Sequence, residues 1–157
     1  MQNQCFDMGN RYFLGQQGEA QDREAAYHWY KSAADEGHAG AQHSLGLMYH
    51  FGQGVEKNTA LAALWYAKAA ESGYQLSQLA LAELYYKHEK DYEKAYHWYE
   101  LLAAEGHPSA LYYLGCMYEN GQWVYESRAI AVEYHRRAAA KGHVGAKIRL
   151  EKISAQL

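Results

Sequence analysis

The feature that most limits how this chain can fold is a set of four residue positions that recurs four times. Each copy holds an aromatic pair, such as Trp29-Tyr30, with alanine three residues before its first member, alanine five residues after it and glycine eight residues after it. The intervals between successive pairs are 36, 33 and 36 residues. Fixed offsets at such a period are the signature of a repeat protein, in which stacked units share one core. The first members of the four pairs are Trp29, Trp65, Trp98 and Tyr134.

Each repeat contains the patterns of two helices. One is alanine-rich, as in EAAYHWYKSAADEG at residues 24–37, where small residues admit a neighbouring helix and tryptophan is expected to fill the space beside it. The glycine eight residues after the tryptophan is placed to end this helix in the left-handed conformation. The other helix carries leucine and tyrosine four residues apart on one face, as an amphipathic helix does. These pairs are Leu45 and Tyr49, Leu81 and Tyr85, and Leu114 and Tyr118.

Two glycines lie inside the helices that carry the leucine and tyrosine pairs. Gly46 and Gly115 each follow one of the leucines in mid-helix, where glycine is less favourable than alanine by about 1 kcal/mol. We therefore expect a partner helix to pack against bare backbone at both positions. A two-helix unit of this size cannot bury its apolar face alone, so the units must stack.

Taken together, these patterns resemble the Sel1-like repeat, a relative of the tetratricopeptide repeat. The best match is residues 41–73, which read A-xxx-L-G-xx-Y, then G-x-G-V, then W-Y-xx-A-A-xx-G. The resemblance implies an all-α fold, a right-handed α-solenoid of about four helix-turn-helix repeats that spans residues 1–157 as a single domain. The predicted repeats are residues 4–40, 41–76, 77–109 and 110–145, followed by a capping helix at 146–157.

The repeats depart from the family pattern at three places. The third lacks the G-x-G-V loop and joins its helices by a connection three residues shorter. The fourth has Trp123 where the second loop glycine stands in GQGV. We expect Trp123 to be exposed and to be a candidate contact for a partner; the alternative is that it folds back over the last helix pair. The capping helix has Glu151 in place of the mid-helix glycine.

Charge, hydropathy and cysteine content exclude several classes of protein. Lys and Arg number 15 and Asp and Glu 18, a net charge of −3 that argues against nucleic-acid binding as the main task. No apolar run approaches the ~18 residues of a membrane span, and the first residues do not read as a signal peptide. Cys5 and Cys116 lie three repeats apart, too far to pair. Two free thiols predict a cytoplasmic protein, or a periplasmic one if a leader has been removed.

Nine histidines raise the question of a metal site. No two of them have the i, i+3 or i, i+4 spacing that places two ligands on one helix face, and His43 and His50 come nearest. His28 and His97 are expected to point outward, and the histidines after the helix-ending glycines are expected to favour those helix ends electrostatically. We predict no metal and no cofactor. Since no catalytic motif is present either, we predict no enzymatic activity.

The related tetratricopeptide solenoids suggest where a partner would bind. In them the first helix of each repeat lines a concave groove. The equivalent positions of this chain, counted from the mid-helix glycine of each repeat, hold aromatic, apolar and lightly charged residues. The alternative is that some of these residues form the core between repeats. The predicted groove contacts are His43, Leu47, His50, Phe51, Glu83, Tyr86, Lys87, Tyr112, Cys116 and Glu119.

The resemblance thus implies a non-catalytic bacterial adaptor that binds a protein or peptide partner through this groove. Alternatives are an immunity-type neutraliser of a toxin or a secretion-associated chaperone, and, more distantly, an enzyme or a metal-binding module. Neither nucleic-acid binding nor membrane insertion is expected, and the identity of the partner and the oligomeric state stay open.

Overall fold

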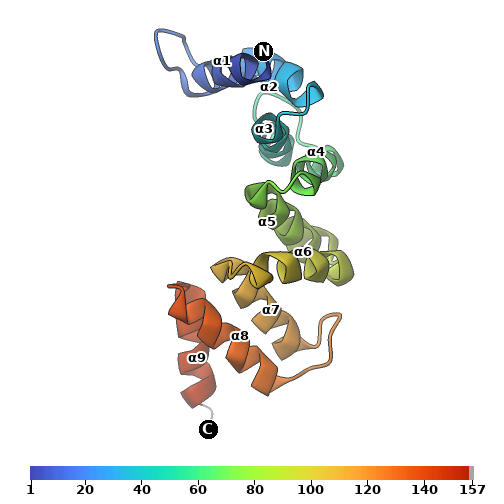
Figure 1. Cartoon of the computed structure of the whole chain (residues 1–157), viewed down its shortest axis with the longest axis vertical. Helices are drawn as coiled ribbons and strands as arrows, with labels where there is room; N and C mark the ends of the chain where they lie inside the picture. The colour runs from blue at the N-terminus through green and yellow to red at the C-terminus, as the bar shows by residue number, and fades with distance from the viewer. Residues whose placement is uncertain (156–157) are drawn as a thin grey trace. The chain divides into compact units, whose positions relative to one another are not determined.

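The computed structural model describes residues 1–155, a region that contains nine α-helices, one π-helical segment and no strand. Four helix pairs and a final helix account for it, which confirms the predicted all-α class. The predicted capping helix corresponds to the last of these helices, and its positions Gln156 and Leu157 lie outside the described residues. In chain order the elements are α1 (Gln2–Leu14), α2 (Arg23–Asp35), α3 (Ala39–Phe51), α4 (Thr59–Glu71), α5 (Gln75–Leu84), η1 (Tyr85–Glu89, the π-helical segment), α6 (Tyr92–Ala104), α7 (Pro108–Asn120), α8 (Arg128–Ala140) and α9 (Val144–Ala155) (Figure 1).

The chain divides into two compact units, Met1–Leu81 and Ala82–Leu157. In the first unit α1 packs on α2, α2 on α3, and α3 on α4; in the second η1 packs on α6, α6 on α7, α7 on α8, and α8 on α9 (Figure 1). Within each unit a helix therefore contacts the helices next to it along the chain, as in a solenoid. We call α1, α3, α5, α7 and α9 the first helices and α2, α4, α6 and α8 the second helices. The single continuous solenoid over 1–157 stays a prediction.

Polar residues at the helix starts explain where most of these helices begin. Each second helix is preceded by a residue whose side-chain oxygen accepts a hydrogen bond from a backbone N–H in the first turn. The imidazoles of His38 and His143 do the same for α3 and α9, because their Nδ1 atoms accept from the N–H groups of Ala41 and Ala146. This capping role of the two histidines was not predicted. The four caps of the second helices are Asp22, Asn58, Asp91 and Ser127.

The glycines predicted to end the second helices do so in the left-handed conformation. Their φ angles lie between 79° and 90°, a region that glycine enters without the penalty that a Cβ imposes. The glycine prediction is confirmed at all four positions, Gly37, Gly73, Gly106 and Gly142.

The closest contact within a pair joins a mid-helix glycine to the second residue of the aromatic pair. A Cβ atom placed on Gly9, Gly46 or Gly115 would meet the rings of Tyr30, Tyr66 or His135, respectively, at less than 3.0 Å. Side chains do not approach each other so closely, so only glycine allows the ring to lie on the backbone of the first helix. The predicted backbone-close packing at Gly46 and Gly115 is confirmed.

The prediction that tryptophan fills the core of each repeat was only partly right. Trp65 is 6% exposed, but Trp29 is 37% exposed and Trp98 is half-buried. The residue after each first aromatic is the one that is consistently buried, at 3% exposure or less. Adjacent residues on a helix point about 100° apart, so only one of them can face the first helix. The four buried residues are Tyr30, Tyr66, Tyr99 and His135.

The third repeat departs from this arrangement. Ala82 occupies the sequence position of the glycine, and the buried hydroxyl of Tyr99 has no hydrogen-bond partner. In the first repeat, by contrast, the Tyr30 hydroxyl donates to Oδ1 of Asn10 over 2.9 Å. The missing loop is replaced by η1, which extends the first helix to Glu89, and by Lys90, whose φ of 58° makes the turn into α6. The shorter connection was correctly predicted, whereas the π-helical turns were not.

The fourth repeat has a histidine in the ring position. His135 is fully buried, and its Nε2 lies 3.4 Å from Oε2 of Glu119. Burial lowers the pKa of His135; the nearby Arg149 and His143 act in the same direction, and Glu119 opposes them. The imidazole is therefore neutral in the folded protein at pH 7.

Replacing Gly46 by alanine should destabilise the protein although alanine is the better helix former. The added Cβ would press on the Tyr66 ring, and overpacking of this kind costs about 1–3 kcal/mol. Urea unfolding followed by circular dichroism measures the change. Ala82→Gly is the control, since it should lose only the helix preference of about 1 kcal/mol. A Gly46→Ala protein as stable as the parent would contradict the close contact.

The protein should become less stable as the pH falls, and the size of this loss should depend on His135. A histidine whose pKa is lowered by folding favours the neutral form in the folded state, so its contribution is present above the unfolded-state pKa of about 6.5 and is lost as pH falls below it. His135→Tyr, which restores the residue found in the other three repeats, should lose less unfolding free energy between pH 7.5 and 5.5 than the parent. Equal losses in the two proteins would show that His135 is not responsible.

Candidate functional site

The predicted groove residues lie on the first helices or on η1, which continues α5, and several of them flank the buried ring of their own repeat. Relative to the glycine or alanine beneath the ring, they stand three residues before it or four after it. The His43 and His50 rings lie 5.5 and 6.2 Å from the Tyr66 ring, and Tyr86 lies 6.1 Å from Tyr99. These positions are half-buried. These side chains therefore pack against the core ring and also leave an edge exposed, and their role as partner contacts stays a prediction.

In the first unit, Phe51 is the most open of the predicted contacts. It is 61% exposed, and its ring stacks on that of His50 with centroids 4.6 Å apart and planes 5° apart. His43 is directed inward instead: its Nδ1 lies 2.8 Å from Oγ of the buried Ser77, and burial lowers its pKa. Leu47 is half-buried. Phe51 is thus the apolar side chain in this group that a partner could cover.

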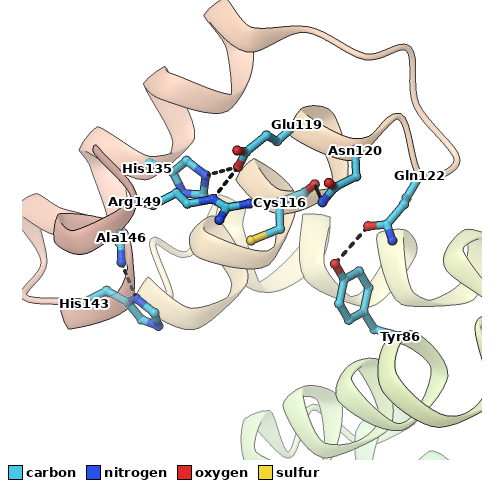
Figure 2. A network of polar contacts seen from close by, with 9 residues as sticks. All are labelled: Tyr86, Cys116, Glu119, Asn120, Gln122, His135, His143, Ala146 and Arg149. Atoms are coloured by element: carbon cyan, nitrogen blue, oxygen red, sulfur yellow. Dashed lines mark hydrogen bonds and ion pairs between the residues drawn. The ribbon is translucent and has the colours of Figure 1, made fainter. Parts of the chain in front are cut away.

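In the second unit, Glu83, Tyr86 and Lys87 are held in place by their neighbours. Lys87 forms an ion pair with Glu83, and its ammonium lies 5.1 Å from the centre of the Tyr113 ring. The Tyr86 hydroxyl donates to Oε1 of Gln122 over 2.9 Å (Figure 2). Burial raises the pKa of Tyr86 to about 12, so the hydroxyl stays a donor at neutral pH. The group presents a fixed aromatic edge beside one positive and one negative charge.

The two helices of the fourth repeat and the final helix converge on one carboxylate. Figure 2 shows Glu119 of α7 between His135 of α8 and Arg149 of α9. Nε of Arg149 donates to Oε2 of Glu119 over 2.8 Å, and the same oxygen faces His135. Glu119 was predicted as a groove contact, and that role stays a prediction. The structure shows that its carboxylate ties α9 to α7 and α8, with a quarter of the side chain exposed.

Cys116 does not match its predicted role as a groove contact. It is 8% exposed, and burial raises the pKa of its thiol, which keeps the sulfur protonated. Bulky side chains cover it, among them Tyr112, whose ring stacks on His143 with centroids 4.5 Å apart. Cys116 is therefore a core residue, and Tyr112 is half-buried beside it.

Trp123 is exposed, as predicted, and lies in a strained loop. Its φ of 65° matches the 75° of Gly54 at the same position of the second repeat, although a residue with a Cβ pays about 1 kcal/mol or more there. Its side chain is 57% exposed, and Tyr125 beside it is 95% exposed. The two rings border a shallow apolar pocket that Tyr118 and Ile130 complete. Its role as a partner contact stays a prediction.

Arg149 was missed although the sequence contained the signal for it. The final helix aligns with the earlier first helices, and Arg149 stands two residues before the position of the mid-helix glycine, as Tyr113 does in the fourth repeat. The exposed positions of His28 and His97 on the second helices were predicted correctly.

Residues 1–155 contain no group of three or more His, Cys, Asp or Glu side chains that could hold a metal ion. Both cysteines are free thiols, as predicted. No helix within this range is long and apolar enough to cross a membrane. What the first helices do offer is aromatic edges and paired charges whose positions are fixed by the core.

Comparison with solved structures identifies close relatives of this fold. A Sel1 repeat protein from Oxalobacter formigenes is 32% identical and superposes with a TM-score of 0.91 over 99% of this chain and 63% of that one. A protective antigen from uropathogenic Escherichia coli with an SLR fold is 29% identical, with a TM-score of 0.59 over 100% of this chain and 42% of its own.

The sequence has relatives as well. An uncharacterized protein of Neisseria meningitidis serogroup B is 34% identical over 133 residues, which is 83% of this chain. The chain spans only 28% of the length of that protein. Four segments match the family model for the Sel1 repeat, at residues 5–38, 39–74, 75–107 and 108–143. Because these matches cover most of its length, the chain belongs to the Sel1 repeat family.

Proposed function

We propose that this protein is a non-catalytic interaction module that binds a protein or peptide partner through its first helices. The observation that carries the proposal is that aromatic and charged side chains on these helices are open to solvent yet already fixed. Phe51 is stacked on His50, and Lys87 is paired with Glu83 and lies over Tyr113.

Fixed side chains favour binding because ordering a free one on association costs about 0.5–1.5 kcal/mol. Tyr86 is held by its hydrogen bond to Gln122 and by rings on three sides, so little of this cost remains. Aromatic residues are also the usual anchors of protein interfaces. The mixed charges of Glu83 and Lys87 would orient a partner more than they would strengthen its binding.

A peptide or helix suits a surface built from successive first helices, whose side chains recur at regular intervals. We therefore place the partner's contacts on each unit by itself. They are His50 and Phe51 in the first unit, and Tyr86, Lys87 and Tyr112 in the second, with Trp123 as a further contact from the loop. Cys116 is left out because it is buried. Two free thiols fit a reducing compartment such as the cytoplasm, where we expect the protein to act as an adaptor.

Phe51→Ala should weaken partner binding by about 1–3 kcal/mol, the magnitude of an interface anchor. The partner is captured from a lysate of the source organism on immobilised protein and identified by mass spectrometry. Its affinity for each purified variant is then measured by calorimetry. Because Phe51 is largely exposed, circular dichroism and melting should be unchanged.

His28→Ala and His97→Ala are the matched controls, since both side chains are exposed on second helices. They should leave the affinity unchanged. If the affinity falls with these two variants and not with Phe51→Ala, the partner binds the second helices and the proposal is wrong.

A further inference from the structure

The loop of the fourth repeat forms an aromatic pocket whose counterpart in the second repeat is lined differently. It lies between the end of α7 and the start of α8 and has a volume of about 800 Å³. The counterpart has a volume of about 490 Å³ and is lined in part by Glu56 and Lys57. Trp123 and Tyr125 occupy the positions of Gly54 and Glu56 in the fourth repeat. None of the described residues that line this larger pocket is charged.

Trp123 is less favourable for the fold than the glycine it replaces. The backbone there has a φ of 65°, a conformation that a residue with a Cβ adopts only at a cost in free energy. The Trp123 ring is mostly exposed, so its burial offsets little of that cost. Strained residues of this kind cluster at sites that bind ligands. The pocket beside Trp123 is therefore a candidate binding site.

The third repeat shows which kind of group lies against the tyrosine of this pocket. Tyr85 stands at the position of Tyr118, and the ammonium of Lys94 lies 5.2 Å from the centre of the Tyr85 ring. A cation over an aromatic face is attractive. In the fourth repeat Ile130 takes the place of Lys94. The fourth pocket thus has more aromatic rings than the third but lacks the lysine at this position.

The charges around the pocket also favour a cation. Residues 118–127 contain two glutamates and no Lys or Arg. Glu126 is exposed, and its Cβ lies against Gly121, one of the residues that line the pocket. Arg128, which follows this segment, donates to the carbonyl oxygen of Ile153 over 3.0 Å. A positively charged occupant would therefore meet a surface of complementary charge.

Arginine suits the pocket better than lysine does. In the third repeat the lysine also pairs with Asp91 at 2.8 Å, and the fourth repeat has Ser127 in place of this carboxylate. An ammonium is strongly hydrated, whereas a guanidinium is more weakly hydrated and stacks on aromatic rings. Next to the pocket, the guanidinium of Arg137 lies 5.5 Å from the centre of the Tyr134 ring, which stacks on Tyr118. Hydroxyl groups in the pocket can accept hydrogen bonds from a second guanidinium.

We propose that the loop pocket of the fourth repeat binds an arginine side chain of a protein or peptide partner, with the guanidinium against the rings of Tyr118, Trp123 and Tyr125. This inference deepens the proposed function and rests on it only for the role of Trp123 as a partner contact. Its test uses synthetic peptides in place of the natural partner. The pocket and the first-helix contacts can therefore fail independently of each other.

Three peptides that differ in one side chain probe the pocket. Acetyl-Gly-Gly-X-Gly-Gly-amide is synthesised with arginine, lysine or citrulline at X, and citrulline is an uncharged analogue of arginine with nearly the same shape. Each peptide is titrated into the ¹⁵N-labelled protein. Two-dimensional NMR spectra report the shifts of the backbone amides and of the Trp123 indole N–H.

The arginine peptide should shift signals of residues 118–130 and bind about two- to fivefold more tightly than the citrulline peptide, the range of an exposed cation–π contact. The lysine peptide should bind more weakly than the arginine peptide. Trp123→Gly should abolish the preference for arginine and still fold, because glycine adopts this φ freely. Glu126→Lys should weaken binding of the arginine peptide about twofold or more. Glu71→Lys, the same charge change at an exposed position of α4, should not.

Four outcomes would overturn the proposal. Equal binding of the arginine and citrulline peptides would show that the pocket does not select a positive charge. Equal binding of the arginine and lysine peptides would show that it does not select a guanidinium. The other two are an absence of shifts at tens of millimolar peptide and an arginine preference that persists in Trp123→Gly.

Discussion

The contact on which the rest of this structure depends is an aromatic ring lying on the bare backbone of a neighbouring helix. Tyr66 over Gly46 shows it most simply, and Tyr30 and His135 repeat it in the first and fourth repeats. Glycine in mid-helix costs about 1 kcal/mol. The packing offsets that cost, because the ring then brings two helices together along their length and is itself buried. The small residues on the second helices allow the same close approach from the other side.

The ring contact also organises the surface. A ring that spans the first helix is flanked by the residues three before and four after the glycine, so those side chains are fixed by the core whatever their chemistry. His50, Tyr86 and Glu119 occupy the same position in three repeats and have three different polar partners. The scaffold thus holds variable side chains at constant places.

Much of this could be predicted from spacing alone. The offsets indicated the helix pairs, the glycine ends of the second helices and the close approach at Gly46, since each follows from helix geometry. The sequence could not tell which member of Trp65-Tyr66 faces the first helix, because both are large and aromatic. Nor could it reveal that Cys116 is buried or that Arg149 reaches Glu119, because both facts depend on how α7, α8 and α9 pack in three dimensions.

Native-state hydrogen exchange tests the central role of the ring contact most directly. The third repeat has alanine in place of the glycine and a buried Tyr99 hydroxyl without a partner, an omission that costs about 1–3 kcal/mol. If the contact governs stability, amides of α6 should open with a lower free energy than those of α4, where Tyr66 lies on Gly46. Protection in α6 equal to or greater than in α4 would show that the repeats are held together by something other than this contact.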